Sequence, residues 1–236
     1  IPLWHKWRRK ASGEVLEGNS LVTTIDLELQ EAAFDALEGY SGAIGVMEVG
    51  TGRILAFTSA PSYDPNEISV QWEALQERTD APLLNRMNFG LYPPGSTFKL
   101  VTTLAYLRQH EEAEFSYTCE GSARFRNTTV HCNNEKAHGT QTLKEAFANS
   151  CNCAFYNLGN MVGIEDIYSY SADFGLGKEV LCINGIAEDR GIVPSAVSNQ
   201  RELANISIGQ GDVMVTPLQI ADMLCTICNG GVRKQL

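Results

Sequence analysis

Apolar residues in the first quarter of the chain change from helical spacing to a β-rich pattern. Residues 27–37 carry apolar side chains at helical spacing after Asp26, a favourable N-cap. Two β-rich runs follow, residues 43–49 and 53–59, joined by the glycine turn Gly50-Thr51-Gly52. The pattern predicts an N-terminal helix and then a β-hairpin.

Helical patterns dominate the remainder of the chain. Residues 96–107 are apolar with few polar interruptions, so this helix should be buried and central. A polar, irregular stretch over 111–138 separates it from a helix, or closely joined pair, that begins at the Thr142 capping box. Further helices are expected over 164–174 and from Thr216 to Asn229. A hairpin before a helix-rich centre indicates an α+β fold, with helices packed on a mostly antiparallel sheet.

The amino-acid composition excludes two classes of binding partner. The 236 residues carry 28 acidic and 18 basic side chains, a net charge of −10, which argues against a nucleic-acid or anionic-membrane surface. No window approaches the roughly 18 apolar residues of a membrane-spanning helix, and the N-terminus lacks a signal-peptide pattern. Residues 1–22 lack steady periodicity. We expect no nucleic-acid partner, a chain that is soluble as given, and a lead-in linker over 1–22.

The cysteines do not form the pattern of a disulfide scaffold. They are odd in number and scattered through the chain: Cys119, Cys132, Cys151, Cys153, Cys182, Cys225 and Cys228. Cys225 and Cys228 have C-x-x-C spacing, but they lie in an apolar helical run and no second Cys or His pair is placed to complete a zinc site. Two buried small side chains are favoured there over a metal or redox role. We expect no metal and no cofactor.

Ser96 and Lys99 are the first candidates for chemistry. They are three residues apart at the predicted start of a helix, so their side chains share one face. A serine hydroxyl needs a base, and a lysine can serve when burial lowers its pKa. The helix N-terminus adds free N–H groups and a partial positive charge for an oxyanion. The alternative is a capping serine with an exposed lysine, but Lys99 lies among apolar neighbours, where an amine needs a partner.

Ser150-Cys151-Asn152 supplies a second hydroxyl and a side-chain amide. Such groups can relay a proton to a leaving amine and bind the amide of an acyl chain. In the alternative interpretation, these side chains only bond the backbone or solvent.

Together the motifs resemble the transpeptidase domain of class B penicillin-binding proteins, which are related to the serine β-lactamases. The resemblance covers about residues 22–232, including the predicted hairpin. It rests most on Pro93-Pro94-Gly95-Ser96-Thr97-Phe98-Lys99, Ser150-Cys151-Asn152, and Ile208-Gly209-Gln210-Gly211 followed by Thr216-Pro217-Leu218-Gln219. It implies a DD-peptidase/β-lactamase-like transpeptidase fold, with residues 23–236 forming part of that domain.

The resemblance also implies roles. Ser96 would attack the D-Ala-D-Ala stem peptide of peptidoglycan or a β-lactam and form an acyl-enzyme. Lys99 would be its base, buried within hydrogen-bond reach of both Ser96 and Ser150. Ser150 would pass protons between the lysine and the leaving group, and Asn152 would hold the substrate amide. Implied partners are stem peptides, β-lactams and cell-wall synthesis proteins such as a glycosyltransferase, at the extracytoplasmic membrane face, with membrane attachment only through an upstream anchor.

One family motif is missing. No Lys-Thr-Gly or Lys-Ser-Gly follows Asn152, so the resemblance implies a fragment that lacks C-terminal strands and is weak or inactive alone, or else a degenerate relative that has lost activity. Two alternatives stay open. A serine β-lactamase would need an acid to activate water, and Glu202-Leu203-Ala204-Asn205 is the only acid-amide group nearby. A penicillin-sensing or scaffold domain would keep the serine without cross-linking.

Cys119 and Cys132 bracket a polar segment that precedes His138. If the domain lies outside the cytoplasm, as the resemblance implies, they can form a disulfide. They can equally remain thiols, because the bond needs a Cα separation below about 7 Å, which sequence does not supply.

Overall fold

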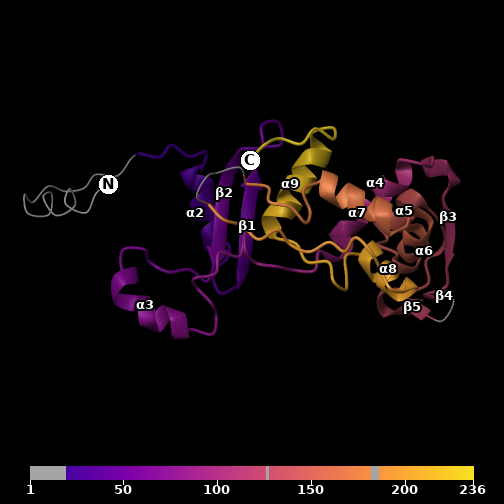
Figure 1. Ribbon diagram of the computed structural model, residues 1–236, viewed down its shortest axis with the longest axis horizontal. Coiled ribbons are helices and arrows are strands. Elements are labelled where there is room, and N and C mark those ends of the chain that lie inside the picture. The colour runs from indigo at the N-terminus through magenta and orange to yellow at the C-terminus, as the bar shows by residue number, and fades with distance from the viewer. Residues whose placement is uncertain (1–19, 126–127, 182–185) are drawn as a thin grey trace, which may run out of the picture.

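The N-terminal part of the molecule is a β-hairpin packed between two helices. The computed structural model describes residues 20–125, 128–181 and 186–236. Strands β1 (Gly42–Met47) and β2 (Ile54–Ala60) pair antiparallel. Helix α2 (Leu27–Asp35) packs mainly against β2, and α9 (Pro217–Cys228) packs against β1 (Figure 1). The predicted helix and hairpin are confirmed, and Asp26 caps α2 by accepting from the Leu29 N–H.

The second part is a group of helices around α4 (Lys99–Leu107), which continues the short 3₁₀ helix η1 (Gly95–Phe98). Around it lie four further helices: α5 (Leu143–Ala148), α6 (Asn152–Val162), α7 (Ile164–Asp173) and α8 (Gln200–Ser207). Helix α4 contacts α6 and α7, and α6 contacts α8. Phe98 and Val101 are fully buried in a cluster with Ile167 and Val213. The prediction of a buried, central helix after residue 96 is confirmed.

The polar stretch after α4 is not irregular, and that prediction is wrong. Four short strands lie there: β3 (Ser116–Cys119), β4 (Ser122–Phe125), β5 (Thr128–His131) and β6 (Gly139–Thr142). The 3₁₀ turns η2 (Glu112–Glu114) and η3 (Asn133–Glu135) accompany them. β3 pairs with β6 and β4 with β5, both antiparallel. Four-residue strands are too short to show a clear alternation of apolar and polar residues, so periodicity could not reveal them.

Two helices were also absent from the sequence prediction. Helix α3 (Ile68–Glu77) has no clear local signal, because it buries only Leu75 and its N-cap makes no side-chain bond. Helix α8 has a usable signal, because the Asn199 side chain accepts from the Glu202 N–H. That is an N-cap bond of the kind a sequence search looks for.

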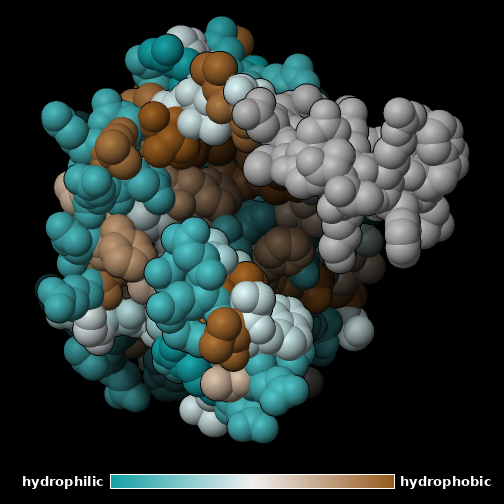
Figure 2. All heavy atoms as spheres, turned by 90° about the vertical axis from the view of Figure 1, so that its left-hand side faces the viewer, coloured by the Kyte–Doolittle hydropathy of each residue, from teal (hydrophilic) through white to brown (hydrophobic). Residues whose placement is uncertain are grey.

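The fold class is confirmed as α+β, with antiparallel pairing of all the strands in the described ranges. These strands form three separate two-stranded sheets. From the end that carries α2 and α3, apolar side chains are recessed between hydrophilic ones (Figure 2). In the described part of the chain, no helix has both the length and the apolar character required to cross a bilayer. Most of the predicted 1–22 linker, and Cys182, lie outside the described residues.

Candidate active site

The turn that carries Ser96 is held by a segment more than a hundred residues away in sequence. Tyr92 and Val215 exchange two backbone hydrogen bonds of 2.9 and 3.0 Å, and the Gly95 N–H donates to the Gly209 carbonyl at 2.8 Å. Gly209 has φ +68°, and a Cβ there would lie 2.4 Å from the Gly95 carbonyl oxygen. Only glycine permits this approach. The motif at 208–211, to which the sequence assigned no role, therefore positions the start of η1.

Lys99 is buried, with 1% of its surface exposed. Its Nζ donates to the Ser150 carbonyl at 2.8 Å, to Ser150 Oγ at 2.9 Å and to Asn152 Oδ1 at 2.8 Å. The ring of Phe155 lies 5.3 Å from Nζ. Each ammonium hydrogen thus has an acceptor, which offsets the cost of burying the charge.

A left-handed residue at the junction of two helices brings Ser150 and Asn152 to the lysine. Helix α5 ends at Ala148 and α6 begins at Asn152, and Ser150 between them has φ +49°. This conformation is rare for a residue with a Cβ and costs roughly 1–3 kcal/mol. The bend turns both side chains of the motif toward Lys99, and Asn152 is the first residue of α6.

The two serines are joined directly. Ser150 Oγ donates to Ser96 Oγ at 2.9 Å. One hydrogen bond therefore joins Lys99 Nζ to Ser150 Oγ, and the next joins Ser150 Oγ to Ser96 Oγ. We expected Lys99 to reach both hydroxyls; the bonds to Ser150 are present, whereas the described bonds reach Ser96 only through Ser150. Ser96 itself is exposed, which leaves the hydroxyl open to a ligand.

Burial lowers the pKa of Lys99 from 10.5 to about 8. Any negative charge on the sulfurs of Cys151 and Cys132 opposes this shift. An amine with such a pKa is neutral in a substantial fraction of molecules at mildly alkaline pH, when it can accept a proton.

An apolar groove lies next to the segment that carries Ser96. It is lined by β1, the segment before Ser96 and α9: Ala43, Ile44, Gly45, Met87, Tyr92, Pro94, Thr97, Val215, Thr216, Pro217, Ile220, Ala221 and Leu224. Thr97, the residue after Ser96, contributes to the lining, whereas Ser96 itself does not.

Other candidate residues lie outside this hydrogen-bonded chain. The Glu202 carboxylate accepts from the Ser198 N–H and Asn199 Nδ2 at 2.7 Å each, at the start of α8. Cys225 is buried as predicted, but the same prediction for Cys228 is wrong, because this residue is exposed on the last turn of α9. Cys119 and Cys132 are free thiols with their sulfur atoms 3.6 Å apart.

Known proteins that resemble this chain are penicillin-binding proteins. Residues 42–236 match the model of the penicillin binding protein transpeptidase domain. The chain is 35% identical to "Peptidoglycan D,D-transpeptidase PbpA" of Mycolicibacterium smegmatis, over 94% of this chain and 48% of the relative. "Peptidoglycan D,D-transpeptidase MrdA" of Acinetobacter baumannii is 30% identical, over 91% of this chain and 34% of the relative. The chain spans at most about half the length of these curated relatives.

Solved structures of penicillin-binding proteins also resemble this chain. Penicillin-binding protein A from M. tuberculosis, as its penicillin G acyl-enzyme complex, superposes with a TM-score of 0.84 at 34% identity, over 97% of this chain and 57% of that one. Pseudomonas aeruginosa PBP2 in complex with WCK 5153 gives 0.83 at 33% identity, over 93% and 54%.

Proposed function

Because this chain belongs to the penicillin-binding protein transpeptidase family, we propose that the protein is a peptidoglycan D,D-transpeptidase that forms an acyl-enzyme through Ser96. The observation that carries the proposal is the unbroken hydrogen-bonded chain from Lys99 Nζ through Ser150 Oγ to Ser96 Oγ. The chain of hydrogen bonds links the solvent-exposed hydroxyl of Ser96 with the buried amine of Lys99, whose pKa is lowered. This is the arrangement that an activated serine requires.

In the acylation step, Ser96 Oγ attacks the carbonyl carbon of the penultimate D-Ala of a stem peptide. Its proton passes to Ser150 Oγ while Ser150 gives its own proton to the neutral amine of Lys99. The oxyanion develops near the first-turn N–H of Ser96, which has no acceptor within the helix. The C–N bond then breaks, and Lys99 returns a proton through Ser150 to the nitrogen of the departing D-Ala.

Cross-linking follows the same path in reverse. The amine of a second peptide attacks the Ser96 ester, gives its proton to the Lys99 amine through Ser150, and Ser96 Oγ recovers a proton as the ester bond breaks. Asn152 Oδ1 continues to accept a hydrogen bond from Lys99 Nζ. The Nδ2 group of Asn152 donates a hydrogen bond to a carbonyl oxygen in the acyl chain of the substrate. A β-lactam enters by the first step, with its ring nitrogen as the tethered leaving group.

Partners and location follow from the same assignment. Residues 23–236 are assigned to the transpeptidase domain and 1–22 to a linker. The relatives named as peptidoglycan transpeptidases support stem peptides as partners, and the penicillin G acyl-enzyme complex of M. tuberculosis penicillin-binding protein A supports β-lactams. The complex of Helicobacter pylori PBP2 with MreC supports cell-wall synthesis proteins. A glycosyltransferase is the expected protein partner at the extracytoplasmic membrane face, because it supplies the glycan strands that the transpeptidase links.

Two assays on the full-length protein test the function. Release of D-Ala from a stem-pentapeptide donor in the presence of an acceptor amine is expected, together with a cross-linked product. A fluorescent penicillin should stay bound for long after excess label is removed. Rapid loss of the adduct would indicate a β-lactamase, and a lasting adduct without D-Ala release would indicate a sensor or scaffold.

The pH dependence of acylation follows from Lys99. The amine accepts a proton only when neutral, so the acylation rate should rise about tenfold per pH unit below the pKa and level off above it. Because the pKa of Lys99 is lowered to about 8, the rate should stop rising and become constant near pH 8. Second-order rate constants for penicillin labelling between pH 6 and 10 measure it, and a flat profile over this range would exclude Lys99 as the proton acceptor.

A further inference from the structure

Ser207, the last residue of α8, lies where the three segments that build the active site meet. Helix α4 carries Lys99, helix α6 begins at Asn152, and the loop that follows α8 holds the turn before Ser96. Ser207 is fully buried, and the acyl-transfer steps do not use its hydroxyl. Its contacts with α4 and α6 therefore suggest a different role.

The first contact joins α8 to α4. Thr102 Oγ1 donates to the Ser207 carbonyl at 2.8 Å, and both residues are fully buried. Carbonyls in the last turn of a helix lack a donor within the helix, so the Thr102 hydroxyl supplies one from outside. Thr102 lies one helical turn after Lys99, on the same face of α4. This hydrogen bond therefore fixes the end of α8 relative to the part of α4 that bears the lysine.

The second contact joins α8 to α6 through a glycine. Gly159 lies inside α6, two turns after Asn152, and a Cβ there would lie 1.7 Å from Ser207 Oγ and 2.5 Å from Ser207 Cβ. Glycine is unfavourable inside a helix, because fixing its backbone costs more entropy than fixing that of alanine. At this position it leaves room for the Ser207 side chain. The glycine thus permits a close approach of α6 and α8.

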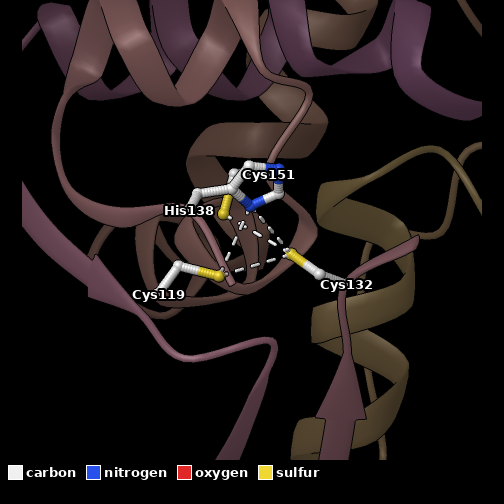
Figure 3. A group of neighbouring side chains, drawn as sticks. All are labelled: Cys119, Cys132, His138 and Cys151. Atoms are coloured by element: carbon white, nitrogen blue, oxygen red, sulfur yellow. Dashed lines mark hydrogen bonds between the residues drawn. The ribbon is translucent and has the colours of Figure 1, made fainter. Parts of the chain in front are cut away.

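The start of α6 is held separately, by the region of β3 to β6. Cys151 is the N-cap residue of α6, and its sulfur lies 3.5 Å from Cys132 Sγ. Both residues belong to one group with Cys119 and His138 (Figure 3). These contacts fix the first residue of the helix, whereas its separation from α8 is set two turns further along, at the glycine.

We propose that Ser207 is a positioning residue for acyl transfer. Through Thr102 and Gly159 it sets the spacing of α4, α6 and the loop after α8. This role rests on the proposed function, because what it positions is the hydrogen-bonded chain from Lys99 to Ser96. A misplacement of about 1 Å in such a chain can lower a rate on the order of 100-fold. Ser207 acts through the helices that it joins and not through contact with the substrate.

The test exchanges the two side chains in the full-length protein. The Cβ added by Gly159→Ala would lie 2.5 Å from Ser207 Cβ, whereas carbon atoms pack at about 3.5–4.0 Å, so α6 and α8 must move apart by about 1 Å. The rate constant for acylation by saturating penicillin should fall about 100-fold. Ser207→Gly alone should lower it less, because it leaves a small gap and no overlap.

The double variant is the decisive one. Ser207→Gly removes both atoms that the new Cβ overlaps, and the remaining Cα lies 3.8 Å from that Cβ, an ordinary contact. Gly159→Ala combined with Ser207→Gly should therefore acylate within about threefold of Ser207→Gly alone. Gly50→Ala is the matched control, because a Cβ at Gly50 meets no atom within 4 Å. Its rate constant should equal that of the wild type.

Saturation kinetics separate positioning from loss of fold. Unfolded molecules lower the amount of labelled protein, but they leave the first-order rate constant of the folded molecules unchanged. A misplaced hydrogen-bonded chain lowers that rate constant, while the dissociation constant of penicillin before acylation changes less. Stopped-flow measurement with a chromogenic β-lactam over a range of concentrations gives both constants.

Thr102→Val decides the question if Gly159→Ala does not fold. Valine keeps the shape of the side chain but leaves the Ser207 carbonyl without its donor, so the rate constant should fall about tenfold. Thr102→Ser restores the donor and should recover most of the rate. A wild-type rate constant in folded Gly159→Ala or in Thr102→Val would overturn the proposal, and so would a double variant that stays as slow as Gly159→Ala.

Failure of the proposed function gives a different result. If penicillin does not label the wild-type protein, the acyl-transfer assignment is wrong and the role of Ser207 fails with it. If the wild type is labelled on Ser96 and the variants acylate at its rate, only the role of Ser207 is wrong.

Discussion

Ser96→Ala is expected to abolish covalent labelling of the full-length protein by penicillin. Ser96 Oγ is exposed and accepts from Ser150 Oγ, and it is the hydroxyl at the free N-terminus of the helix that carries Lys99. Without it no ester can form, and loss of a nucleophile costs on the order of 10⁶-fold in turnover. Mass spectrometry of the labelled wild-type protein should find the adduct on the peptide that contains Ser96.

Ser116→Ala is the matched control, since it removes an exposed serine hydroxyl from β3. It should be labelled at the wild-type rate. Equal labelling of Ser96→Ala, or an adduct on Ser150 in the wild-type protein, would show that the wrong hydroxyl has been assigned as nucleophile. A melting curve for each variant separates loss of chemistry from loss of fold.

Lys99→Met should lower the acylation rate by about 10²- to 10⁴-fold, the range for loss of a general base. Methionine fills the buried space without a proton acceptor, and it leaves Ser150 Oγ and Asn152 Oδ1 without their donor. Lys99→Arg should fail similarly, because a guanidinium stays charged at every accessible pH and its planar fork does not fit the three acceptors around Nζ. Stopped-flow measurement of the second-order rate constant with a chromogenic β-lactam tests both.

Lys144→Met is the control for the loss of charge. Lys144 is exposed on α5, two turns before the Ser150 junction, and lies outside the described hydrogen-bond chain. Its rate should equal that of the wild type. A Lys99→Arg variant that acylates at the wild-type rate would mean that positive charge alone is required and that the proton leaves by another path.

Local signals in the chain predicted much of the fold. The Asp26 and Thr142 caps, the Thr216 capping box with Pro217, and the glycine turn of the hairpin each act within a few residues, and each element is present. These signals are readable because backbone N–H groups at a helix start need acceptors that nearby side chains supply. The strands β3 to β6 gave no such signal, since each is only four residues long and shows no clear alternation of apolar and polar residues.

The sequence by itself determined the chemistry available: Ser96 and Lys99 on one face of a helix, a second hydroxyl and amide at Ser150 and Asn152, and the glycine at 209. Only the tertiary structure decided how these groups meet. The left-handed Ser150 places its hydroxyl between the amine and Ser96, and Lys99 is buried against a segment 51 residues away. The convergence of Cys119, Cys132, His138 and Cys151 was likewise decided by packing. Distances between residues far apart in the chain are set by which surfaces bury one another, and no local pattern of side chains encodes them.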